Sequence, residues 1–158
     1  MTARTEVGSV LPLRVGPYLD PDNTAFWTGG QNGRLLIHHC GDCGWWTHPA
    51  SPRCRKCRSA NVSPEPVSGR ATVATYTVNH KAWIPGSELY IIALVELEEQ
   101  PALFLTTNLV EVDAEDVFIG MPVEVVFEES NGVWYPLFRP SLPQAGGPSL
   151  PQAGGPAR

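Results

Sequence analysis

Apolar and polar residues alternate with a period of two along most of the chain after residue 67, which is typical of strands with one face in water. In residues 122–129, for example, apolar side chains at 123, 125 and 127 alternate with glutamates at 124 and 128. Asn131-Gly132 predicts a tight hairpin near the end, because both residues tolerate positive φ. Five segments of this kind predict five strands, at residues 70–81, 90–98, 102–110, 122–129 and 133–139.

Residues 113–118 predict one or two helical turns between the third strand and the fourth. Five short strands with a small helix in that position match the OB-fold, a partly open Greek-key barrel. An SH3-like barrel is the structural alternative, and the number of strands alone does not separate the two. The sequence therefore predicts a mainly β fold with a small barrel.

The first half of the chain is less regular. Residues 1–19 lack periodicity and predict an arm that is ordered only by a neighbour. Asp20-Pro21 then predicts a helix start, since aspartate caps free N–H groups and proline suits the first helical position. Phe26-Trp27 gives this short helix an apolar side, and Gly29-Gly30 predicts its end. Residues 34–39 predict a strand that runs into a pair of cysteines.

The end of the chain has a different composition. The eight residues SLPQAGGP at 141–148 are repeated at 149–156. Such a Pro/Gly-rich segment cannot bury enough apolar surface to offset the entropy of ordering. The sequence therefore predicts four parts, which are an arm at 1–19, a helix with the cysteine-rich segment at 20–66, the barrel at 67–140 and a disordered tail at 141–158.

All four cysteines form two C-x-x-C pairs, separated by ten residues. The pairs are Cys40 with Cys43 and Cys54 with Cys57. Two such pairs can aim four sulfurs at one point, as in the tetrahedral sites that zinc prefers. A redox-active dithiol and a disulfide are the alternatives, and the spacing favours zinc over both. Because four cysteines close the coordination shell, we expect one structural Zn²⁺ in a rubredoxin-like zinc ribbon ahead of the barrel.

Charge is distributed unevenly along the chain. Residues 82–138 contain no lysine or arginine, and the formal net charge is −5. Nucleic-acid binding needs clustered cations, so this distribution opposes it. The cations near the second cysteine pair either offset the charge of a zinc thiolate site or meet an anionic ligand such as phosphate. The residues that we expect at such a ligand are Arg53, Arg55 and Lys56, with Trp83 as an aromatic neighbour.

Histidines are further candidates for a functional role. His38, His39 and His48 lie close to the cysteines, but four sulfurs suffice as ligands, so solvent-facing or supporting positions are favoured. His80 ends the first barrel strand near Trp83 and can line a ligand groove, although a simple surface position is favoured. The chain has no phosphate loop, nucleophile elbow or zinc-protease motif, so we name no catalytic residue.

Composition limits the class of protein further. Among 158 residues, 42% are hydrophobic, and 16 prolines and 15 glycines favour turns and short strands. No stretch approaches the roughly 20 apolar residues that span a bilayer, and the N-terminus lacks the apolar core of a signal peptide. We therefore expect no membrane association and a cytoplasmic protein whose thiols stay reduced.

Several short motifs occur in a distinctive order. They are Phe26-Trp27, Gly33-Arg34-Leu35, the two cysteine pairs, Val67-Ser68-Gly69, ALVEL at 93–97, IGMPV at 119–123 and Phe138-Arg139-Pro140. In this order, over roughly residues 17–140, the chain resembles the zinc-ribbon plus OB-fold family catalogued as domain of unknown function 35. Members of that family are found beside thiolase-like enzymes.

The resemblance implies a non-catalytic accessory subunit of a thiolase-like enzyme that acts on acyl-CoA. Some members complete an aldolase that cleaves steroid side chains by a retro-aldol step, and others pair with a MaoC-like hydratase or a condensing enzyme. We therefore expect a thiolase-like aldolase or acyltransferase subunit as partner, with acyl-CoA shared between the two. A nucleic-acid-binding module and an independent enzyme centred on His80 and the 83–90 loop are the alternatives.

Overall fold

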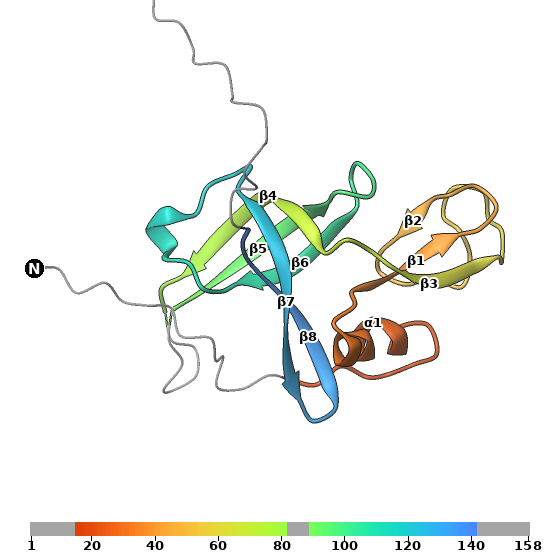
Figure 1. Cartoon of the computed structure of the whole chain (residues 1–158), viewed down its shortest axis with the longest axis horizontal. Helices are drawn as coiled ribbons and strands as arrows, with labels where there is room; N and C mark the ends of the chain where they lie inside the picture. Colours follow the sequence, from red (N-terminus) through yellow and green to blue (C-terminus); the bar gives the residue numbers. More distant parts are fainter. Residues whose placement is uncertain (1–14, 82–88, 142–158) are drawn as a thin grey trace, which may run out of the picture.

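The computed structural model describes residues 15–81 and 89–141, in which a small three-stranded sheet stands beside a closed five-stranded barrel (Figure 1). Trp83 and the predicted tail from residue 142 onward lie outside these ranges. None of the described helices has the length and apolarity that crossing a membrane would require.

The first sheet consists of β1 (Leu36–Cys40), β2 (Trp46–Thr47) and β3 (Val62–Pro66). The barrel consists of β4 (Arg70–Asn79), β5 (Tyr90–Leu97), β6 (Phe104–Leu109), β7 (Pro122–Ser130) and β8 (Val133–Pro140).

The helix at the start of the chain begins later than the sequence suggested, and a 3₁₀ helix follows its predicted end. Asp20 caps free N–H groups as expected, because its Oδ1 accepts hydrogen bonds from Asp22 and Asn23 at 2.9 and 2.8 Å. The regular helix α1 nevertheless spans only Thr24–Thr28. Gly29 caps the end of α1 as predicted, and the 3₁₀ helix η1 (Gly29–Asn32) then continues the helical path to Gly33, where φ reaches 65°.

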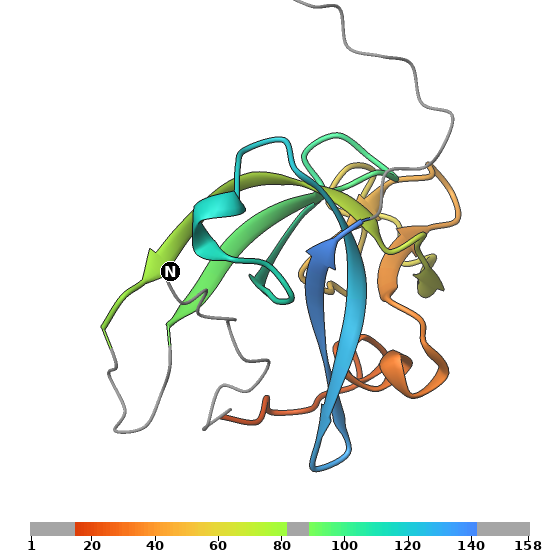
Figure 2. The same ribbon diagram turned by 60° about the vertical axis from the view of Figure 1, so that its left-hand side comes forward.

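The reason for the paired glycines is close packing. A Cβ atom at Gly30 would lie 2.5 Å from both Phe127 Cδ1 and Trp134 Cβ. These two residues belong to β7 and β8, so η1 is pressed directly against the hairpin that the two strands form. Figure 2 shows this hairpin reaching down to the helical segment.

The barrel strands follow the order β4-β5-β6-β8-β7, and β7 returns to pair with β4. All pairs are antiparallel except β6 with β8. The last strand is therefore inserted between the third and the fourth, in a Greek-key arrangement as in the OB-fold, and the helical turn η2 (Ala114–Asp116) lies where it was predicted. Asn131 and Gly132, at φ of 53° and 78°, form the predicted hairpin.

Alternate residues of the barrel strands fill one apolar core. In β5, Ile91, Ala93, Val95 and Leu97 are all buried, and the residues between them are partly exposed. The same core includes side chains from the segment before the barrel, Leu35 and Ile37. The small sheet is thus attached to the barrel through shared apolar contacts.

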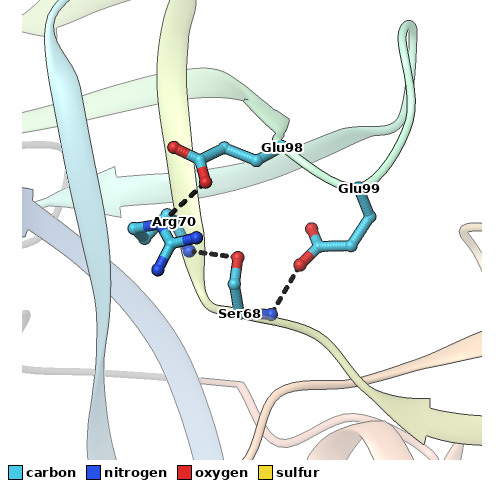
Figure 3. A network of polar contacts seen from close by, with 4 residues as sticks. All are labelled: Ser68, Arg70, Glu98 and Glu99. Carbon is cyan, nitrogen blue, oxygen red and sulfur yellow. Dashed lines mark hydrogen bonds and ion pairs between the residues drawn. The ribbon is translucent and has the colours of Figure 1, made fainter.

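Polar contacts fix the place where the chain enters the barrel (Figure 3). Glu98 Oε2, just after β5, accepts a hydrogen bond from Arg70 Nε at 2.7 Å. Glu99 Oε1 accepts the backbone N–H of Ser68 at 2.5 Å, and Ser68 Oγ accepts the N–H of Arg70 at 3.1 Å. The turn after β5 therefore holds the linker between the two sheets.

Candidate metal centre and adjoining pocket

The structure brings the four cysteine sulfurs together at one end of the small sheet. All four lie within 4.8 Å of one another, with 3.6 Å between the sulfurs of Cys40 and Cys57 and 3.5 Å between those of Cys43 and Cys54. A tetrahedron with Zn–S bonds of about 2.3 Å places its sulfurs roughly 3.8 Å apart. A disulfide needs about 2.05 Å, so this arrangement fits a single zinc ion and not a bridged pair.

The two cysteine pairs sit in matching turns. After each pair the chain folds back, and Gly44 N–H donates to Cys40 O at 2.8 Å as Arg58 N–H donates to Cys54 O at 2.9 Å. Gly44 and Arg58 both have positive φ, 70° and 63°. Such turns point backbone N–H groups at sulfur, which favours the thiolate form that a metal requires.

Backbone N–H groups point at the sulfur most clearly at Cys54. The N–H groups of Cys57 and Lys56 lie 3.5 and 3.4 Å from its Sγ. These hydrogen bonds, that of Cys57 foremost, lower the pKa of the Cys54 thiol to about 6. Backbone N–H groups, together with the neighbouring Cys43 and Cys57 side chains, therefore prepare this sulfur for metal binding.

Hydrogen bonds of Asp42 to Ser59 and Asn61, which we call the polar brace, join the two turns outside the metal centre, and no sequence motif predicts them. Asp42 Oδ2 accepts the Ser59 hydroxyl at 2.5 Å, and its Oδ1 accepts the Asn61 amide at 2.7 Å. These two bonds hold the pKa of Asp42 below its usual value. Gly41 leaves room beside the brace, because a Cβ there would lie 2.7 Å from Asn61 Nδ2 and would displace that amide.

The nearby histidines support the ribbon and stand outside the sulfur cluster. His38 is buried, and its Nδ1 lies 3.1 Å from Ser51 O. The ring of His39 stacks on Trp46 at 4.3 Å between centroids, and its Nδ1 lies 3.1 Å from Glu65 Oε2. These contacts fix loops of the ribbon against its strands.

The predicted cationic residues are exposed at the second cysteine turn, but only two of them share a pocket. Arg55 and Lys56 line a cavity of 360 Å³ together with Trp45 and Gln100. Lys56 Nζ lies 4.9 Å from the centre of the Trp45 ring, a cation–π distance. Arg53 Nη1 instead donates to Arg58 O at 3.3 Å and does not line this cavity. His80 is exposed after β4 and lines neither this cavity nor the larger one described next.

A larger pocket of 570 Å³ lies where α1, the small sheet and the barrel meet. Its size is typical of small-molecule sites. Among the described residues, the lining contains no lysine, arginine, aspartate or glutamate. Its walls are formed by Asn23, Phe26, Trp27, Leu36, Ile37, His38, Thr47, His48, Pro49, Ala50, Phe104, Thr106, Thr107, Asn108, Tyr135, Pro136 and Leu137.

His48 is the titratable group that distinguishes this pocket. Its ring lies 4.9 Å from that of Phe26, which in turn meets Trp27 edge-on at 4.8 Å. Burial lowers the pKa of His48 to about 4, and the charges of Arg55 and His38 act in the same direction. His48 is therefore neutral near pH 7. We call this cavity the neutral pocket, because its described lining has no lysine, arginine, aspartate or glutamate. Because Thr47 and His48 line both cavities, the neutral pocket adjoins the cationic one.

Comparison with known proteins assigns both parts of the chain. Residues 27–63 match the rubredoxin-like zinc ribbon domain of ChsH2, and residues 64–128 match the ChsH2 C-terminal OB-fold domain. A DUF35 domain-containing scaffold protein of Methanocaldococcus jannaschii is 40% identical over 96 residues, which cover 59% of this chain and 67% of that protein.

A probable enoyl-CoA hydratase alpha subunit of Thermomonospora curvata is 35% identical over 134 residues, or 84% of this chain. The chain spans only 41% of the length of that protein. Among solved structures, the one titled Ltp2-ChsH2(DUF35) aldolase matches with a TM-score of 0.71 and 35% identity, covering 80% of this chain and 100% of that chain.

These matches agree with the geometry. The zinc ribbon has its four cysteines positioned to bind one Zn²⁺, and the barrel is an OB-fold, as the sequence predicted. The SH3-like alternative is wrong, because the last strand is inserted between the third and the fourth. The chain belongs to the DUF35 family of zinc-ribbon and OB-fold proteins.

Proposed function

We propose that this chain is a non-catalytic accessory subunit of a thiolase-like acyl-CoA enzyme, and specifically of an aldolase that shortens steroid or other bulky acyl-CoA side chains by retro-aldol cleavage. The observation that carries the proposal is the match to one chain of the structure titled Ltp2-ChsH2(DUF35) aldolase, along the whole length of that chain. A cytoplasmic location agrees with a site of four thiolates, which needs reduced cysteines.

The two adjoining cavities support a share in acyl-CoA binding. An acyl-CoA combines a long neutral arm with a cluster of phosphates. The neutral pocket suits the arm, and Arg55 and Lys56 in the adjoining cavity suit the phosphates. Arg53 and Trp83 stay predictions as further contacts.

The chemistry itself belongs to the partner in this proposal. In a retro-aldol step a base removes the proton of the β-hydroxyl group, the carbon–carbon bond breaks, and the thioester stabilises the enolate that forms. The chain described here orders the acyl-CoA channel of the partner enzyme and excludes water from it.

Nucleic-acid binding has little support from the barrel. Its two described strand arginines are both neutralised, Arg70 by Glu98 and Arg139 by Glu124 and Glu111. A cationic groove for a phosphate backbone is therefore missing from the described strands.

Co-expression with a thiolase-like candidate partner from the same organism tests the proposal. We expect acyl-CoA cleavage, followed by release of the carbonyl product, only when both chains are present.

In the complex, Arg55→Ala with Lys56→Ala should raise KM several-fold with little change in kcat, as expected for lost ground-state binding. Arg34→Ala, an exposed arginine outside both cavities, is the control. Full activity of either chain alone would reject the accessory role, and an unchanged KM would reject the phosphate contact.

A further inference from the structure

The turn between η2 and β7 holds two large apolar side chains out in water. Phe118 is 54% exposed and Ile119 is 68% exposed, whereas Val117 and Met121 beside them are buried. The exposure therefore follows from the fold and does not reflect a loosely packed segment. Neighbouring exposed apolar side chains of this size are typical of surfaces that bind another protein.

Backbone hydrogen bonds make this turn rigid. Met121 N–H donates to Phe118 O at 3.2 Å and closes the turn around Gly120, whose φ is 89°. Gly120 N–H donates to Val73 O at 2.7 Å, and Val73 N–H donates to Met121 O at 2.9 Å. Because the turn is fastened to β4 on both sides, its apolar residues lose little conformational entropy on binding.

The charges around the turn indicate what covers it. Glu115 and Asp116 are exposed in η2, just ahead of Phe118. Residues 89–138 contain no lysine or arginine to offset them. A second copy bound through the same face would bring like charges together, and an anionic lipid surface would be repelled. A protein surface with an apolar cleft and a rim of lysine and arginine is the complementary partner.

We propose that the Phe118–Ile119 turn is the docking surface for the thiolase-like partner subunit, an inference that rests on the proposed function. Both views place η2 away from the zinc ribbon, on the other side of the barrel (Figures 1 and 2). The turn is therefore separate from the cavity that Arg55 and Lys56 line, and the docking surface can be tested independently of the phosphate contact.

Binding of the full-length chain to the purified thiolase-like protein tests the inference by biolayer interferometry. Phe118→Ser with Ile119→Ser should raise the Kd by at least about tenfold, since buried apolar anchors dominate interfaces. Glu115→Lys with Asp116→Lys should slow association several-fold at low salt and weaken its salt dependence. Tyr18→Ser changes an apolar residue that is 87% exposed elsewhere, and should leave the Kd within about twofold. Zinc content and circular dichroism confirm that each variant is folded.

The outcomes separate the two proposals. If the wild-type chain binds and the Phe118/Ile119 variant binds equally well, the docking surface is wrong and the accessory role stands. If the wild-type chain does not bind, both are wrong. Light scattering supplies a third outcome, because self-association that is lost in the same variant would assign the turn to a second copy and overturn the inference.

Discussion

The zinc ribbon and the barrel are both antiparallel β structures, yet their interiors are built differently. The ribbon has strands of 5, 2 and 5 residues, and two of its most buried side chains are the metal ligands Cys40 and Cys54. The barrel strands are 6 to 10 residues long and close around a continuous apolar core. The apolar residues of the ribbon side, Leu35 and Ile37, join that barrel core.

This contrast shows how one short chain combines two sources of stability. A three-stranded sheet of this size buries too little apolar surface to fold alone, so metal binding supplies the missing free energy. The barrel obtains its stability from burial of apolar side chains. The two regions should therefore respond to different perturbations.

Removal of the metal should have the largest effect. Structural zinc contributes an apparent free energy on the order of 10 kcal/mol in small domains, so Cys54→Ser or a strong chelator should unfold the ribbon. The barrel amides should stay protected, because their core does not contain the metal. Hydrogen exchange followed by NMR or mass spectrometry measures both regions at once.

Ser63→Ala, at an exposed position of β3, is the matched control and should keep both zinc and protection. If the barrel amides of the Cys54→Ser variant exchanged together with those of the ribbon, the two regions would form a single cooperative unit, and the contrast would fail.

The second prediction concerns the contact between η1 and the barrel. Gly30→Ala would place a Cβ within 2.5 Å of Phe127 and Trp134, so it should lower the free energy of unfolding by about 1–3 kcal/mol through overpacking. Chemical denaturation of the zinc-loaded protein measures this. Gly16→Ala adds the same methyl group where no atom lies within 4 Å, and should be close to neutral. Equal stabilities of the two variants would mean that η1 moves aside without cost.

The barrel and the metal centre were readable from sequence because each rests on a local repeating pattern. Alternation at 122–129 and the Asn131-Gly132 turn predicted a strand and a hairpin that the structure contains. The third barrel strand begins at Phe104, later than predicted, because Ala102 adopts φ of 62° in the preceding turn. Two C-x-x-C pairs sufficed to predict the sulfur cluster.

Other features had no local signal. The edge strand β3 contains Pro64 and Pro66, which remove backbone donors and do not indicate a strand. Gly29-Gly30 predicted the end of α1 correctly, but the sequence does not show that Gly30 also permits close contact with Phe127 and Trp134, which lie far along the chain. The neutral pocket is assembled from five separate segments of the chain, so no motif reveals it, and the sequence predicts no role for His48 in it.

The smallest predicted effect lies at the junction of the two regions. The carboxamide of Gln100, after β5, pairs with the backbone of Trp46 in β2: its Oε1 accepts the Trp46 N–H at 3.0 Å, and its Nε2 donates to Trp46 O at 3.3 Å. One side chain thus binds the edge of the ribbon sheet as a neighbouring strand would.

Gln100→Ala should lower the free energy of unfolding by about 1 kcal/mol, typical of lost hydrogen bonds at a partly exposed site, and speed exchange of the Trp46 amide. Zinc content and barrel protection should not change. Gln100→Glu keeps the acceptor and loses the donor, so its free energy of unfolding and its Trp46 exchange rate should lie between those of the wild type and of Gln100→Ala. Unchanged exchange at Trp46 in the alanine variant would mean that apolar packing of Leu35 and Ile37 alone orients the ribbon on the barrel.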